Sequence, residues 1–99
     1  MYFIYILYSL KSDRFYIGYS PDPHKRLLEH NSYTNKSKYT AKHQPWELKC
    51  FFEVSNNISD AIRVERFIKN QKSKVFLNKI ITQFNDQEFI QSIIINATR

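Results

Sequence analysis

The chain has 99 residues, the size of one ordinary domain, which leaves no room for a second independent hydrophobic core. Hydrophobic residues make up 42% of it and aromatic residues 16%, a composition that excludes wholesale disorder, and the single cysteine, Cys50, excludes an intramolecular disulfide and a cysteine-rich zinc module. The formal net charge of +6 favours an anionic partner such as nucleic acid or an acidic membrane surface, with a basic domain that has no such partner as the plain alternative.

The first two predicted elements form an antiparallel hairpin. Residues 2–8, YFIYILY, are β-branched or aromatic at both odd and even positions, which is typical of a central strand covered on both faces. This apolar run is far shorter than the roughly 20 residues of a membrane-spanning helix and lacks signal-peptide features, so we expect a cytoplasmic chain with no membrane partner. After a short polar break, residues 14–19 resume the strand pattern.

The only glycine, Gly18, lies inside the second predicted strand. Glycine at such a position gives up side-chain packing and marks either a bulge or a place where another group approaches the backbone closely. Gly18 could therefore clear space beside Tyr16 and Tyr19, although position alone favours a bulge equally.

A short helix is predicted from the sequence SPDPHKRLLEHN. Asp22 is suited to cap its first turn and Pro23 to occupy its first position, and the helix should end near His30. We expect Leu27 and Leu28 to mark its inner side, while Arg26 and His30, four residues apart, lie on one flank at the edge of the core.

Residues 31–45 are polar and without periodicity, which predicts a loop. Lysines alternate there with tyrosines, and such a mixture suits a nucleic-acid strand because cations meet phosphates while rings stack on bases. The alternative is a solvated loop whose tyrosine rings pack on the body of the protein. The residues concerned are Lys36, Lys38, Tyr39 and Lys42, together with Tyr33 and His43.

Residues 46–54, WELKCFFEV, predict a third strand, in which Cys50 is expected to be a small buried hydrophobe without chemistry. A helix should follow from about residue 58 to 72 with Ser59 as its N-cap, and two further helices are expected over residues 73–84 and 86–95.

Glu65 is out of place on the first of these helices. A helical wheel puts it inside the stripe formed by Ile58, Ala61, Ile62 and Ile68. A carboxylate that faces a core needs a partner, because removing its charge from water costs several kcal/mol. The structural interpretation is an ion pair with Lys69 or with an arginine on a strand, and the functional one is a Mg²⁺ ligand.

Taken together, these residues resemble the GIY-YIG nuclease family. The second signature triplet is intact as residues 16–18, YIG, and the first is represented by residues 3–5, FIY, with phenylalanine where the family usually has glycine. Arg26 stands ten residues after Tyr16, and Glu65 is the acidic residue expected on a later helix. The resemblance covers about residues 2–72, and the chain looks most like small standalone members related to the nuclease domain of the UvrC repair protein.

The resemblance implies an α+β domain over residues 1–99, with a small three-stranded antiparallel sheet flanked by helices. It further implies a DNA endonuclease in repair or recombination that depends on Mg²⁺ or Mn²⁺ held by Glu65 and is directed by DNA structure, possibly branched or single-stranded, rather than by sequence. The catalytic residues would be Tyr5, Tyr16, Arg26, His30 and Glu65, and the DNA-binding residues Gly18, Tyr19, Lys36, Lys38, Tyr39 and Lys42. Which tyrosine acts on the attacking water, and whether His30 takes its proton, stays open.

Two alternatives to cleavage remain at this stage. The same basic and aromatic surface could bind nucleic acid without cutting it, or the domain could bind another protein. Some relatives also use an asparagine after the glutamate helix, for which Asn78 is the nearest candidate. The intact set of Tyr16, Arg26 and Glu65 favours the nuclease, because a protein that only binds DNA does not need all three.

Overall fold

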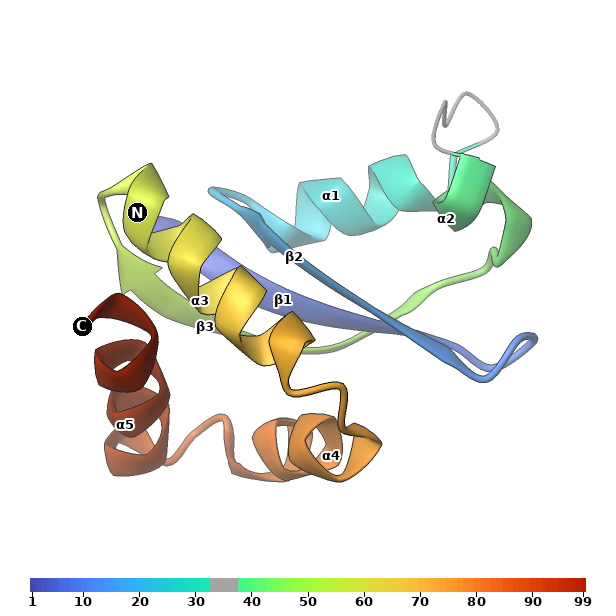
Figure 1. Ribbon diagram of the computed structural model, residues 1–99. Coiled ribbons are helices and arrows are strands. Elements are labelled where there is room, and N and C mark those ends of the chain that lie inside the picture. Colours follow the sequence, from blue (N-terminus) through green and yellow to red (C-terminus); the bar gives the residue numbers. More distant parts are fainter. Residues whose placement is uncertain (33–37) are drawn as a thin grey trace.

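Three strands and five helices make up the part of the chain that the computed structural model describes, residues 1–32 and 38–99 (Figure 1). In chain order they are β1 (Tyr2–Ser9), β2 (Arg14–Ser20), α1 (Pro23–His30), α2 (Lys38–Lys42), β3 (Glu47–Ser55), α3 (Ile58–Asn70), α4 (Lys74–Gln83) and α5 (Gln87–Thr98). The predicted α+β fold with a three-stranded antiparallel sheet is confirmed. Within these ranges no helix is long and apolar enough to cross a membrane.

Strand β1 lies in the middle of the sheet, whose order is β2-β1-β3 with antiparallel pairing on both sides. The β1–β2 hairpin is in continuous register from Phe3↔Ser20 to Ser9↔Arg14. The pattern of residues 2–8 therefore predicted the central position correctly. Strand β2 is left with one free edge, and the functional site lies along it.

Two hydrophobic cores cover the two faces of the sheet. Ile4 and Ile6 of β1 pack with α3, α4 and α5 on one side, and Tyr5 and Leu7 pack with Trp46 on the other, where α1 lies. Figure 1 shows α3, α4 and α5 on one side of the strands and α1 and α2 on the other. Because side chains alternate along a strand, one run of apolar residues supplies both cores.

The first helix begins as predicted. The side chain of Asp22 accepts a hydrogen bond from Lys25 N at 3.1 Å, and Pro23 occupies the first turn. The prediction for Leu28 was wrong, since 72% of its surface is exposed and only Leu27 packs on the core. Adjacent helical residues point about 100° apart, so a helix that touches the sheet along a narrow stripe buries one leucine of such a pair.

Three further predictions need correction. The N-cap of α3 is Asn57 rather than Ser59, because the side-chain Oδ1 of Asn57 accepts a hydrogen bond from Ser59 N at 2.9 Å. Residues 31–45 are not loop throughout, since they contain the short helix α2. The last helix also extends to Thr98, beyond the predicted end at residue 95.

The end of α1 is tied to the start of β3 by Asn31. Its side chain donates a hydrogen bond to the Trp46 carbonyl oxygen at 2.9 Å and accepts one from Trp46 N at 2.6 Å. The Trp46 ring is buried and donates to the Thr40 carbonyl oxygen at 2.8 Å. These bonds hold α1 and α2 next to the face of the sheet that carries Tyr5.

Candidate active site

A pocket of about 350 Å³ opens at the free edge of β2. Four elements of the fold or the turns beside them supply its lining: β1, β2, α1 and α3. The lining residues are Tyr5, Tyr16, Gly18, Tyr19, Ser20, Pro21, Arg26 and Glu65. The structure thus brings four of the five predicted catalytic residues into one pocket, and His30 is the exception. Ser20 and Pro21 were missed, although only Tyr19 separates them from the second triplet in the chain.

Gly18 is required by Tyr5. The two residues are paired across β1 and β2, and a Cβ atom at position 18 would overlap the Tyr5 hydroxyl and lie 2.5 Å from Tyr5 Cζ. Of the two interpretations that the position of Gly18 left open, the continuous register of the hairpin rules out the bulge. The close approach that glycine permits is made by the tyrosine ring, which crosses β2 and reaches the pocket.

Tyr5 is held in its protonated form. Only 1% of its surface is exposed, and its hydroxyl lies 3.0 Å from His30 Nε2. Burial raises the pKa of Tyr5 to about 12, although the hydrogen bond with Arg26 acts in the opposite direction. At Tyr5 the effect of burial on the pKa therefore outweighs that of the neighbouring Arg26 cation.

His30, at the end of α1, packs against the rings of Tyr5 and Tyr16. It is buried, its ring centroid is 4.9 Å from that of Tyr16, and it does not line the pocket. Burial, with Arg26 adding to it, lowers the pKa of His30 below 6.5. His30 is therefore neutral at physiological pH and reaches the pocket through the Tyr5 hydroxyl.

Arg26 supplies the positive charge of the pocket. Its Nη1 donates to Glu29 Oε2 at 2.7 Å, one helical turn away. Burial opposes the charged form, but the hydrogen bonds with Tyr5 and Glu29 outweigh it and raise the pKa of Arg26. The start of α1 is fixed by Ser20, whose hydroxyl accepts a hydrogen bond from Asp22 N at 3.0 Å. A permanently charged guanidinium is thereby placed beside the tyrosines.

Glu65 lies at the border of the buried face of α3, which consists of Ala61, Val64 and Ile68. Its side chain is 16% exposed, and its Oε1 accepts a hydrogen bond from Lys69 Nζ at 2.9 Å. The expected stripe was therefore rotated, since Ile58 is exposed and Glu65 faces the pocket edge. The predicted ion pair with Lys69 is confirmed, and it leaves the carboxylate beside the pocket rather than in the core.

The donor set around the pocket fits a hydrated Mg²⁺ or Mn²⁺ ion. Glu65 is a carboxylate, the preferred protein ligand of such ions, and the hydroxyl groups of Tyr5, Tyr16 and Ser20 belong to the same lining. Among the described residues there is no cluster of three or more His, Cys, Asp and Glu side chains suited to a metal. Mg²⁺ is usually held by one or two protein carboxylates together with waters and substrate phosphates, so the site does not need further protein ligands.

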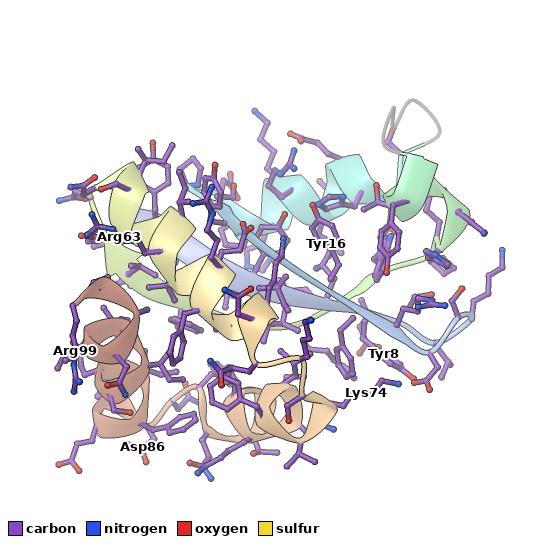
Figure 2. The ribbon with its side chains drawn as sticks, in the orientation of Figure 1. Tyr8, Tyr16, Arg63, Lys74, Asp86 and Arg99 are labelled. Carbon is purple, nitrogen blue, oxygen red and sulfur yellow. The ribbon has the colours of Figure 1, made fainter. Side chains whose placement is uncertain are left out.

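The predicted DNA-binding residues lie on two sides of Tyr16, which Figure 2 shows between α1 and α3. Gly18 and Tyr19 line the pocket. Tyr39 of α2 is 45% exposed, and its ring centroid is 6.3 Å from that of Tyr16, so the ring packs on the body and also presents a free face. Lys42 is exposed on the same helix. Lys36 lies outside the described residues, and only the backbone of Lys38 is described.

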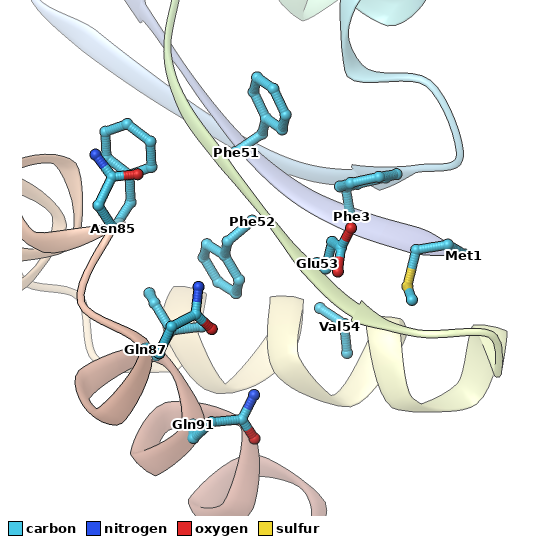
Figure 3. Close-up of a pocket in the computed structure, with 11 residues that line it drawn as sticks. Met1, Phe3, Phe51, Phe52, Glu53, Val54, Asn85, Gln87 and Gln91 are labelled. Atoms are coloured by element: carbon cyan, nitrogen blue, oxygen red, sulfur yellow. The ribbon is translucent and has the colours of Figure 1, made fainter.

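Two other pockets formed by described residues have no lining residue in common with this one. A pocket of about 390 Å³ lies between β3 and the start of α5 and includes Phe3, Glu53 and Gln91 (Figure 3). Phe3, which replaces the glycine of the first triplet, thus lines this second pocket and not the one with Tyr5. Asn78 lines a third pocket with Tyr8, Lys49 and Lys74 among others, away from Glu65.

The chain is similar to a known family and to a curated protein. The family model described as the GIY-YIG catalytic domain matches residues 1–80. The structure-specific endonuclease subunit SLX1 of Kluyveromyces lactis is 31% identical over an alignment of 110 positions, which covers 97% of this chain and 36% of that relative. The chain thus spans only about a third of the length of this relative. No solved structure matches the chain.

Proposed function

Because the chain belongs to the GIY-YIG family of nucleases, we propose that it is a divalent-metal-dependent endonuclease that hydrolyses DNA phosphodiester bonds. We further propose that it selects DNA by structure rather than by sequence and acts in repair or recombination, by analogy with the relative whose name describes a structure-specific endonuclease subunit. The observation that carries the proposal is the shared pocket of Tyr5, Tyr16, Arg26 and Glu65.

Arg26 is assigned to the scissile phosphate. Its guanidinium stays charged, because its contacts with Tyr5 and Glu29 raise its pKa further. A guanidinium donates hydrogen bonds in a fixed planar arrangement that matches phosphate oxygens. It would neutralise the charge that grows on those oxygens as water attacks phosphorus.

The two tyrosines receive different roles. Tyr5, with a pKa of about 12, keeps its proton at neutral pH, so it donates a hydrogen bond and does not act as the base. Tyr16 lines the same pocket and would order the attacking water. His30 is a positioning residue that acts through its contact with the Tyr5 hydroxyl at 3.0 Å.

Glu65 would hold the Mg²⁺ or Mn²⁺ ion, with waters and phosphate oxygens as the remaining ligands. When bound, the ion supplies charge neutralisation at the phosphate and the leaving oxygen. The DNA backbone would pass over Tyr19, Tyr39 and Lys42, and we extend this surface to Gly18, Lys36 and Lys38 by their neighbourhood in the sequence.

A module that binds nucleic acid without cutting it is the second candidate. It is favoured by the ion pairs Arg26–Glu29 at 2.7 Å and Glu65–Lys69 at 2.9 Å, which give both charged residues a partner without metal or substrate. Such a module would bind DNA in a salt-dependent manner even without divalent ions.

A cleavage time course separates the two candidates. Labelled duplex, flap, splayed-arm and four-way DNA would be incubated with Mg²⁺ or Mn²⁺ and wild type, Arg26→Ala or Glu65→Gln. Matched controls are Arg63→Ala on the exposed side of α3 and Glu53→Gln on β3, both outside the pocket. The nuclease should cut branched DNA preferentially, and either pocket variant should lose about 10²–10³-fold in rate or more while binding and circular dichroism are kept.

Two results would contradict the proposal. If the wild type binds DNA but cuts none of these substrates, the binding module is the better description. If the control variants lose as much activity as the pocket variants, the assignment of the pocket is wrong.

A further inference from the structure

Lys69 forms an ion pair with Glu65, the residue that we propose holds the metal ion. Its Nζ is 2.9 Å from Glu65 Oε1 and 5.8 Å from the centroid of the Tyr16 ring. Glu65 and Tyr16 both line the active-site pocket. An ammonium group is therefore bound to one oxygen of the carboxylate that we assign to the metal.

The two side chains of this ion pair differ in how freely they can move away from each other. Lys69 is four residues after Glu65 on α3, the spacing at which helical side chains meet. The lysine side chain is 46% exposed, whereas that of Glu65 is 16% exposed. Lys69 can therefore turn into water while Glu65 stays in place.

A released Lys69 has basic neighbours. It lines a shallow pocket of about 170 Å³ together with Lys72 and Lys74, which follow α3 in the chain. This pocket lies next to the active-site pocket, since Lys69, which lines the shallow pocket, also contacts Glu65 and Tyr16 of the active-site pocket. These three lysines, close to one another in the chain and beside the proposed metal site, form a surface that suits the phosphate backbone of nucleic acid.

We propose that Lys69 is a displaceable counter-ion of the active site, an inference that rests on the proposed nuclease function. Lys69 neutralises Glu65 in the metal-free protein, leaves it when a divalent ion binds, and then contacts a phosphate of the bound DNA. A divalent ion held by Glu65 would repel the ammonium group of Lys69, so the exchange follows from charge. Exposed pairs at this spacing are weak, so the competition should lower metal affinity only about two- to fivefold.

The first test measures Mn²⁺ binding to the protein without DNA, with free Mn²⁺ followed by electron paramagnetic resonance. Lys69→Met should bind Mn²⁺ about two- to fivefold more tightly than wild type. Lys69→Arg, which keeps the charge, should remain near wild type. The matched control is Lys79→Met, since Lys79 Nζ also lies over a ring, 5.2 Å from the centroid of Phe89, and should leave Mn²⁺ affinity unchanged.

The second test measures DNA binding in an Arg26→Ala background, in which the proposed chemistry is removed. In Mn²⁺, adding Lys69→Met should reduce the slope of log affinity against log salt concentration by about 0.9, the value for one lost phosphate contact. In EDTA the same substitution should change the slope less, because Lys69 then stays with Glu65.

Each failure has a separate meaning. Equal or weaker Mn²⁺ binding by Lys69→Met, an equal gain in Lys79→Met, or an unchanged salt slope in Mn²⁺ overturns the counter-ion proposal. Unchanged Mn²⁺ binding by Glu65→Gln overturns the metal site itself, and with it both this proposal and the metal-dependent nuclease.

Discussion

Replacing Gly18 with alanine should disturb the sheet and the active site together. The new Cβ would overlap the Tyr5 hydroxyl and lie 2.5 Å from Tyr5 Cζ. Tyr5 is buried, and its ring stacks on that of Tyr16 with the centroids 6.4 Å apart, so the ring has little room to retreat. Gly18 does not have a positive φ angle, so the backbone itself accepts alanine and the penalty comes from the overlap.

The size of the effect follows from three contributions. Overpacking a buried site costs about 1–3 kcal/mol, and a displaced hydroxyl loses its hydrogen bond to His30, worth about 1 kcal/mol. Alanine returns about 0.4–1 kcal/mol by restricting the unfolded chain. We expect Gly18→Ala to lower the free energy of unfolding by about 1–3 kcal/mol, with a fall in Tm of about 4–8 °C per kcal/mol for a chain of this size.

The assay is a double-mutant cycle with Tyr5→Leu, measured by urea unfolding and circular dichroism. In the leucine background the overlap with the ring is gone, so Gly18→Ala should be neutral or stabilise by up to about 1 kcal/mol. Tyr5→Phe would not serve, because Cζ remains. If Gly18→Ala costs the same in both backgrounds, Tyr5 is not the reason for the glycine.

Three further predictions concern buried groups. Because the pKa of His30 is lowered from 6.5, the unfolded chain binds a proton below about pH 6.5 that the folded protein does not. The urea midpoint should therefore fall between pH 7 and pH 5, less so in His30→Gln, and parallel profiles would contradict this. Tyr5, with a pKa of about 12, should contribute no absorbance change at 295 nm between pH 9 and pH 11, so Tyr5→Phe and wild type should titrate alike there; a smaller change in the variant would show that Tyr5 ionises normally. Burial raises the pKa of Cys50 to about 12, so iodoacetamide should label it in urea but not in the native protein, and rapid native labelling would refute this burial.

Local patterns predicted what depends on neighbours in the chain. The apolar residues of both parities predicted β1 as the central strand, and Asp22 with Pro23 predicted the start of α1. The helical wheel for α3 predicted its buried face only in part. Which side of an amphipathic helix faces the sheet is decided by packing, and Ile58 turned out exposed while Val64 is fully buried.

The candidate site depends on the register of β1 and β2 as well as on the sequence motif. The spacing of Tyr16 and Arg26 indicated the family, but only the pairing of Tyr5 with Gly18 shows what the glycine accommodates. The pKa of Tyr5 likewise follows from burial that no sequence pattern reports. The catalytic and DNA-binding roles of the named residues stay predictions.

The hydrogen bonds between Asn31 and Trp46 fix the two ends of the segment that joins α1 to β3. The entropy cost of closing such a loop grows slowly, by about 0.6 kcal/mol for each doubling of its length. Segments of different length and composition could therefore be inserted there while the sheet, Arg26 and Glu65 keep their places. Two of the proposed DNA contacts, Tyr39 and Lys42, lie in this segment, whereas Arg26 and Glu65 lie outside it, so the proposed DNA contacts and the proposed catalytic residues belong to separable parts of the chain.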